Sequence, residues 1–371
     1  MQGSHRIKTL VAAMAAALLA TGNADALEVD LYGVAHLSVD SNDDGNTSQV
    51  YVASNSSRLG FRGNQPLASG FKAVFQYEAG VDLTGRGTND GNGGGSSNNL
   101  FSTSRDAFVG LAGPFGTVMA GRLGVLNQWV YDYNLFADQV GDLGNIWGGT
   151  GIPGRLNGTV AYATPKIADV VDGLFAYHPE SGTNNADDYV IKVNYGDDRG
   201  IKLGLAYASV GSGNPNFVGT NDQTAFALTG SYSMGDFTVG AGYQKDSNVK
   251  GASNDDRDGY TLGASYRFNG NTTVKAQYVT SNANLANMDA NMWTLGVDYA
   301  LDKSTTIYLA YSSTSNDPLA TFTANDYGHG QAVNPGCISH SCNTNNPAIS
   351  GLDPSSFSIG LVYKFDVGLV K

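Results

Sequence analysis

Hydrophobic and polar residues alternate at every second position along most of the chain. In one segment, Ile201, Leu203 and Leu205 alternate with Lys202 and Gly204. Such alternation places successive side chains on opposite faces of a β-strand, whereas stretches with helical spacing are few. The pattern recurs about 16 times, as in a large membrane barrel. The segments are residues 29–39, 57–62, 71–78, 105–112, 117–122, 155–162, 171–177, 189–195, 201–207, 226–232, 237–243, 260–268, 274–278, 293–299, 307–311 and 357–365.

The connections between these segments are short and long in turn. The short ones are rich in Gly, Asp, Asn or Pro and lie at 63–70, 113–116, 163–170, 196–200, 233–236, 269–272 and 300–304. The long ones lie at 40–56, 79–104, 123–154, 178–188, 209–223, 244–258, 280–291 and 312–356. Short periplasmic turns and long extracellular loops are typical of transmembrane β-barrels, and aromatic residues at many strand ends suit an interfacial girdle.

A barrel is favoured over an open sheet because unpaired N–H and C=O groups are costly in hydrocarbon. The first segment should therefore pair with the last, at 357–365. About 16 strands enclose a lumen wide enough for water. We therefore predict an all-β fold, an antiparallel transmembrane β-barrel of about 16 strands, built as one domain over residues 27–371.

Residues 1–26 have the features of a cleavable secretory signal. Arg6 and Lys8 precede an apolar run from Leu10 to Ala20, and Ala24 and Ala26 supply small residues before the predicted cleavage point. That run is too short for a membrane-spanning helix, which needs about 20 residues. With export and a barrel, the predicted location is the outer membrane of a Gram-negative bacterium, in contact with outer-membrane lipid and lipopolysaccharide.

Charge and motifs narrow the function further. The formal net charge of −12 argues against nucleic acid as a partner. Asp40 to Gly45 begins like a calcium loop, but Tyr51 stands where the bidentate Glu is needed. We found no convincing catalytic set, metal site or cofactor motif. Cys337 and Cys342 lie in the last long loop of an exported chain, which favours a local disulfide.

Several motifs resemble the Gram-negative general porins. They are the segments Ser57 to Gly63, Phe71 to Glu78, Arg105 to Leu111, and Phe115 to Arg122. The closing strand at Phe365 also fits, although such porins usually end on the aromatic residue, and here Asp366 to Lys371 follow it. The resemblance implies a homotrimer with a third long loop, here about 123–154, that folds into the lumen.

In that family, acidic residues on the third loop face basic residues on the wall. The loop contains Asp132, Asp138 and Asp142, and the basic cluster maps onto Arg58, Arg105 and Arg155. An Arg that faced lipid near mid-membrane would cost about 2–4 kcal/mol, which also favours inward placement.

Three neighbouring residues are assigned less directly. Arg62 shares the parity of Arg58 and extends the basic cluster, whereas Arg122 is a candidate contact with a neighbouring subunit. Asp106 should point outward, toward a subunit contact, if Arg105 points inward.

The sequence therefore predicts a porin, a channel for passive diffusion of small hydrophilic solutes and ions, and not an enzyme. A substrate-specific outer-membrane channel with a binding site in the lumen is the main alternative. A barrel hydrolase and a purely structural membrane protein are the others. Because the charges at the constriction roughly cancel, the acidic outer loops predict a modest cation preference that shrinks with salt.

Overall fold

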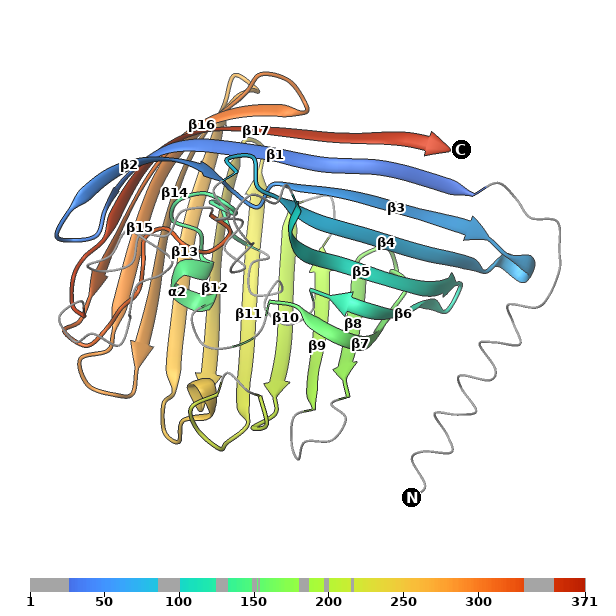
Figure 1. The fold of residues 1–371 in the computed structure, drawn as a ribbon, viewed down its shortest axis with the longest axis horizontal. Helices are drawn as coiled ribbons and strands as arrows, with labels where there is room; N and C mark the ends of the chain where they lie inside the picture. The colour runs from blue at the N-terminus through green and yellow to red at the C-terminus, as the bar shows by residue number, and fades with distance from the viewer. Residues whose placement is uncertain are drawn as a thin grey trace.

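The computed structural model describes residues 27–85, 101–124, 133–148, 152, 154–179, 187–196, 200–214, 217–329 and 350–370. The chain forms one antiparallel sheet that curls into a closed barrel (Figure 1). β2 and β3 both pair with β1, each strand from β3 onward pairs with the next, and β1 pairs with β17. The predicted 16-stranded antiparallel barrel is confirmed, because β2 and β3 together form the second barrel strand.

The strands fall on the alternating segments of the sequence. Their bounds are β1 (Glu28–Asp43), β2 (Ser48–Ser54), β3 (Arg58–Pro66), β4 (Lys72–Val81), β5 (Phe101–Gly113), β6 (Gly116–Leu123), β7 (Leu156–Ala163), β8 (Val171–His178), β9 (Asp188–Gly196), β10 (Ile201–Val210), β11 (Gln223–Met234), β12 (Phe237–Ser247), β13 (Arg257–Phe268), β14 (Thr272–Ala283), β15 (Ala290–Ala300), β16 (Thr305–Asn316) and β17 (Ser355–Val370). The short helical elements are η1 (Ala68–Gly70), α2 (Gly144–Trp147) and η4 (Val249–Gly251). Among the described residues, no helix is long and apolar enough to cross a membrane.

The two ends of the chain close the barrel, as predicted. The β1–β17 ladder runs from Val29 opposite Val370 to Asp43 opposite Ser355. The closing strand is longer than predicted, because Asp366 to Val370 continue it beyond Phe365. These residues keep the alternation and have β1 as a partner, so they belong to the barrel wall.

The predicted loop at 40–56 is wrong. β1 continues to Asp43 and β2 begins at Ser48, which leaves only a tight turn. The polar residues Asp40 and Asn42 had suggested a loop, but they alternate with Val39 and face the inside, where the barrel tolerates polar side chains. The true irregularity is a break between β2 and β3 at residues 55–57, where Ser56 has a φ of 45°.

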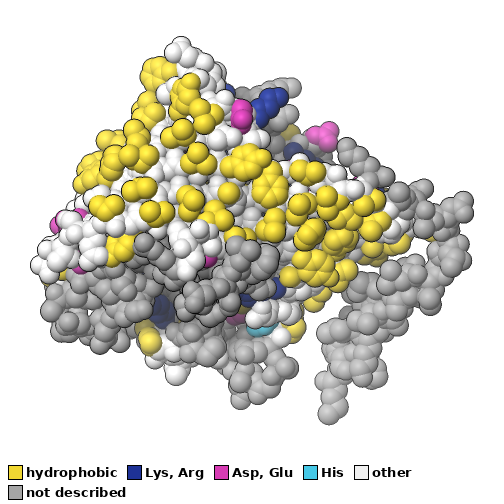
Figure 2. Space-filling model, turned by 45° about the horizontal axis from the view of Figure 1, so that its top comes forward, with side chains coloured by type: hydrophobic (Ala, Val, Ile, Leu, Met, Phe, Trp, Pro, Cys, Tyr) yellow, Lys and Arg dark blue, Asp and Glu magenta, His cyan; other side chains and the backbone are white. Residues whose placement is uncertain are grey.

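The barrel is inside-out relative to a soluble domain. Outward residues such as Leu262 and Leu295 are 59% and 53% exposed, whereas inward polar residues such as Thr294 and Ser358 are 1% and 0% exposed. Figure 2 shows hydrophobic side chains spread over an outer face with few charged ones among them. This distribution suits a barrel with lipid outside and polar groups inside.

Candidate pore constriction

The third long connection, between β6 and β7, enters the barrel. Residues 133–148 of this connection carry α2, whose residues are all buried and which contacts β14 and β15. Tyr133 donates a 2.8 Å hydrogen bond to the carbonyl of Gly263, and Trp147 donates one of 3.2 Å to that of Thr280. The Tyr133 ring also lies over Gly240, where a Cβ would come within 2.5 Å of it. The third loop therefore packs against the inner face of β12 to β14.

Lys275 fastens this loop to the wall. Its ammonium donates 2.9 Å hydrogen bonds to the Leu135 carbonyl and to the Gln139 amide oxygen. It also lies 2.9 Å from the Asp298 carboxylate and is itself only 4% exposed. A buried charge is stable only when it is paired and hydrogen-bonded, so these contacts fix the loop position.

Asp142 organises the loop from within. Its Oδ1 accepts hydrogen bonds from Asn134 and from the Gly144 N–H, and its Oδ2 accepts one from the Asp138 N–H. The residue is 2% exposed, so its carboxylate lies inside the loop instead of on the lumen surface. Burial, and secondarily the charge of Asp138, raises the pKa of Asp142 to about 7.

Asp138 faces the opposite wall. Its Oδ2 lies 3.5 Å from Nη1 of Arg58, which is the first residue of β3. The break between β2 and β3 precedes this arginine and sets its direction. At the break, the side chain of Ser57 bonds the backbone of β1 in place of a neighbouring strand. The Ser57 hydroxyl accepts from the His36 N–H and donates to the His36 carbonyl, both at 3.0 Å. Arg58 in turn donates a 2.9 Å hydrogen bond to the Ser56 carbonyl.

Arg105 and Arg155 each have a carboxylate partner on the wall. Arg105 forms an ion pair with Glu78, which also accepts a 2.9 Å hydrogen bond from Tyr32. Nε of Arg155 lies 2.6 Å from Oδ1 of Asp106. Arg58, Arg105 and Arg155 are therefore all charge-paired.

The expected outward position of Asp106 rested on strict alternation, and the register departs from it there. Tyr77 is opposite Ala107 and Ala79 is opposite Ser104, so β5 carries one extra residue at this point. A β-bulge lets two consecutive side chains approach the same face. Arg105 and Asp106 therefore both enter ion pairs, with Glu78 and Arg155.

Arg62 lies apart from this group, whereas Arg122, opposite Ala107, lies close to Asp106 and Arg155. Arg62 pairs with Asp366 and lies 3.7 Å from Asp30, near the barrel rim where both chain ends lie. Arg122, near the end of β6, donates a 2.7 Å hydrogen bond to Asn157, near the start of β7. Asp132, Cys337 and Cys342 lie outside the described residues, as does the predicted signal at 1–26.

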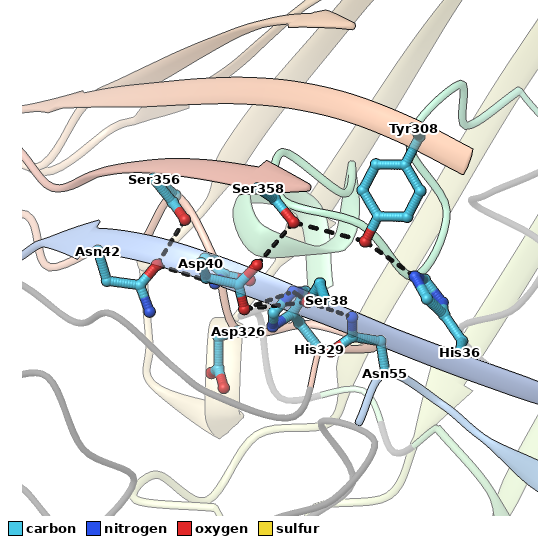
Figure 3. Close-up of polar contacts among 12 residues, drawn as sticks. His36, Ser38, Asp40, Asn42, Asn55, Tyr308, Asp326, His329, Ser356 and Ser358 are labelled. Carbon is cyan, nitrogen blue, oxygen red and sulfur yellow. Dashed lines mark hydrogen bonds and ion pairs between the residues drawn. The ribbon is translucent and has the colours of Figure 1, made fainter. Parts of the chain in front are cut away.

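A second polar cluster, which the sequence analysis did not single out, lines β1, β16 and β17 (Figure 3). Asp40 accepts a 2.6 Å hydrogen bond from Ser358 and lies 3.4 Å from His329. The ring of His36 lies 2.9 Å from the Tyr308 hydroxyl. Lys275 and Tyr308 could have been found by parity, since both occupy inward positions between outward apolar neighbours. The loop residues that they meet carry no such pattern.

Comparisons with known proteins agree with this architecture. A family model described as Gram-negative porin matches residues 9–319. The major outer membrane protein P.IB of Neisseria gonorrhoeae is 32% identical over 201 residues, which cover 51% of this chain and 53% of that protein. The chain thus spans about half the length of this relative.

Solved structures share the fold. An anion-selective porin from Comamonas acidovorans superposes with a TM-score of 0.71 at 22% identity, over 91% of this chain and 100% of that one. OmpT of Vibrio cholerae in its trimer form gives a TM-score of 0.63 at 17% identity, over 92% of this chain and 100% of that one.

Proposed function

The chain belongs to the Gram-negative porin family, and on that basis we propose that it forms a water-filled channel in the outer membrane. Small hydrophilic solutes and ions would diffuse through it passively. The observation that carries this proposal is a closed barrel, polar within, in which the third loop brings Asp138 to 3.5 Å from Arg58. Porins are channel proteins and not enzymes, so passage requires a wetted path and no reaction.

The constriction would combine wall arginines with an acidic loop. Arg58 and Asp138 face each other directly. Arg105 on β5 pairs with Glu78, and Arg155, just before β7, pairs with Asp106. Asp132 is proposed from sequence alone as a further loop acid. Asp142 would act by holding the loop bend, and Arg62 would line the rim where both chain ends lie.

A homotrimer is the proposed assembly. The fold is similar to OmpT of Vibrio cholerae, one structure of which is in a trimer form. Arg122 remains a candidate subunit contact. The apolar outer face would otherwise meet outer-membrane lipid and lipopolysaccharide.

Conductance in a planar lipid bilayer tests the channel. The purified protein should produce discrete, ohmic current steps that scale with salt concentration. Protein that folds and inserts without conducting would contradict the proposal. A substrate-specific channel would instead show currents that saturate or are blocked by one solute.

Two expectations concern regions outside the described residues. We propose that residues 1–26 are removed on export and that Cys337 and Cys342 form a disulfide. Amino-terminal sequencing of protein from outer membranes should begin near Leu27. Mass spectrometry without reduction should find no free thiol, and two free thiols would contradict the bond.

A further inference from the structure

Part of the last long connection also enters the barrel. Residues 323–329, which we call the inner strip, follow β16 and lie between β1 and the third loop. Ala324, Asn325 and His329 are each 0% exposed. Nothing in the strand pattern predicts this, because the segment has no alternation.

The inner strip is fixed to the barrel wall on one side. His329 lies 3.4 Å from both Asp40 and Ser38, two inward residues of β1 (Figure 3). Asn325 donates a 3.4 Å hydrogen bond to Asn42, the next inward residue along the same strand. The wall contacts therefore follow the polar stripe of β1.

On its other side the strip is fixed to the third loop, mainly by Asn145. The Asn145 amide donates a 3.0 Å hydrogen bond to the Ala324 carbonyl. Its oxygen accepts hydrogen bonds from the N–H groups of Asp326 and Tyr327, at 3.0 and 2.7 Å. The Gly141 N–H adds a 2.9 Å hydrogen bond to the Ala324 carbonyl. Asn145 is 5% exposed, so these bonds form in a water-poor junction where each one is strengthened.

The strip also lies against Asp138, the acidic residue of the constriction. Gly328 has a φ of 70°, and a Cβ there would lie 2.6 Å from the Asp138 carboxylate. The carboxylate that faces Arg58 thus has the strip close behind it. Moving the strip would give the Asp138 side chain room to withdraw from Arg58.

We propose that the inner strip is a second constriction element, which with the third loop sets the width of the channel and keeps Asp138 opposite Arg58. Asn145 is the positioning residue that joins the two segments. This inference rests on the proposed channel function.

Single-channel recording of Asn145→Ala tests the role of the junction. The variant loses three hydrogen bonds to the strip, so conductance should rise on the order of twofold and larger neutral polymers should enter the pore. Reversal potentials in a salt gradient should also shift, because Asp138 would no longer be held beside Arg58. Asn284→Ala is the matched control, since the Asn284 side chain likewise bonds backbone groups, here those of Asn254 and Asp256, but in an outer loop.

His329→Ala weakens the attachment of the strip to the wall instead, because the contacts of His329 with Ser38 and Asp40 are lost. Asp40 keeps its hydrogen bonds from Ser38 and Ser358. His329→Ala should also raise conductance, so it tests the inference even if Asn145→Ala does not fold. Folded variants with wild-type conductance and polymer exclusion would overturn the inference while leaving the channel function intact. An equal rise in Asn284→Ala would overturn it as well. A wild-type protein that does not conduct would overturn the channel function itself, and with it this role for the strip.

Discussion

The Arg58 guanidinium lies 3.5 Å from the Asp138 carboxylate, although one residue begins β3 and the other stands in the third loop. Asp138 has a φ of 61°, a left-handed conformation that Asp tolerates better than most residues, and its N–H is bonded to Asp142. Irregular backbone therefore orients both side chains: a left-handed residue in the case of Asp138, and the break between β2 and β3 in the case of Arg58.

Neutralising Arg58 and neutralising Asp138 should shift ion selectivity in opposite directions. The wild type should prefer cations modestly at low salt. Arg58→Gln should strengthen that preference and Asp138→Asn should shift reversal potentials toward anions. One unit charge at about 4 Å in water-like surroundings contributes about 1 kcal/mol, or about fivefold in local ion concentration. Lys303→Gln, in an exposed turn, should leave the reversal potential unchanged.

Asp142→Asn tests whether the charge of Asp142 acts on permeating ions or only on the conformation of the third loop. Because the Asp142 carboxylate is buried in the loop, Asp142→Asn should shift ion selectivity less than Asp138→Asn does. A selectivity shift equal to that of Asp138→Asn, with the loop intact, would show that Asp142 acts on permeating ions directly.

Lys275→Met should loosen the third loop. The change removes hydrogen bonds from a charged donor to Leu135 and Gln139, each worth about 1.5–3 kcal/mol, and leaves Asp298 without its cation. The temperature at which the folded band disappears from unboiled gels should fall, and proteases should cut the loop sooner. Lys303→Met provides the control, and equal behaviour of the two variants would rule out an anchoring role for Lys275.

The barrel could be predicted from sequence because every strand has the same requirement, an apolar outer face and a polar inner face. Period-two alternation marks the two faces, and all of the predicted segments became strands. The errors arose where polar residues were taken for loops, as at Asp40 and Asn42. Inside a wet barrel a polar residue is no sign that a strand has ended.

The site was less predictable, because its geometry depends on irregular backbone. The bulge that brings Arg105 and Asp106 to one face, the break before Arg58 and the bend held by Asp142 leave no periodic signal. Resemblance to the porin family named the charged residues, but it could not say which carboxylate pairs with which arginine.

The order of the third loop should depend on pH through Asp142. Its folded pKa of about 7 lies above the ordinary value of 3.8, so the fold favours the protonated acid. The stability contributed by this group is present below about pH 4 and is lost as pH rises through about 7. Acrylamide quenching of Trp147, in a variant with Trp129 and Trp293 replaced by Phe, should increase over that range.

Two variants check the assignment of that titration. Asp142→Asn should abolish the pH dependence of quenching. Asp138→Asn should move its midpoint to lower pH, because the charge of Asp138 raises the pKa of Asp142. A midpoint that is the same in all variants would assign the titration to another group.

Removal of residues 366–371 should impair closure of the barrel. The deletion leaves Val29 to Tyr32 of β1 without their partners on β17 and removes the ion pair of Arg62 with Asp366. The folded fraction on unboiled gels should fall. Asp366→Asn should fold nearly normally, because an exposed ion pair contributes only about 0–1 kcal/mol. Normal folding of the truncated chain would show that β17 closes the barrel without its last residues.

The pairing of β1 with β17 joins two strands that lie more than 300 residues apart in the sequence. Contacts between such distant residues form slowly, because the intervening chain must first be ordered. Until β17 arrives, the growing sheet has two open edges, each able to pair with another chain. A polypeptide released early keeps both edges open however well its other strands have paired. The topology therefore makes the integrity of the carboxyl terminus a checkpoint for assembly, and it makes incomplete chains the ones most prone to aggregate before they reach the membrane.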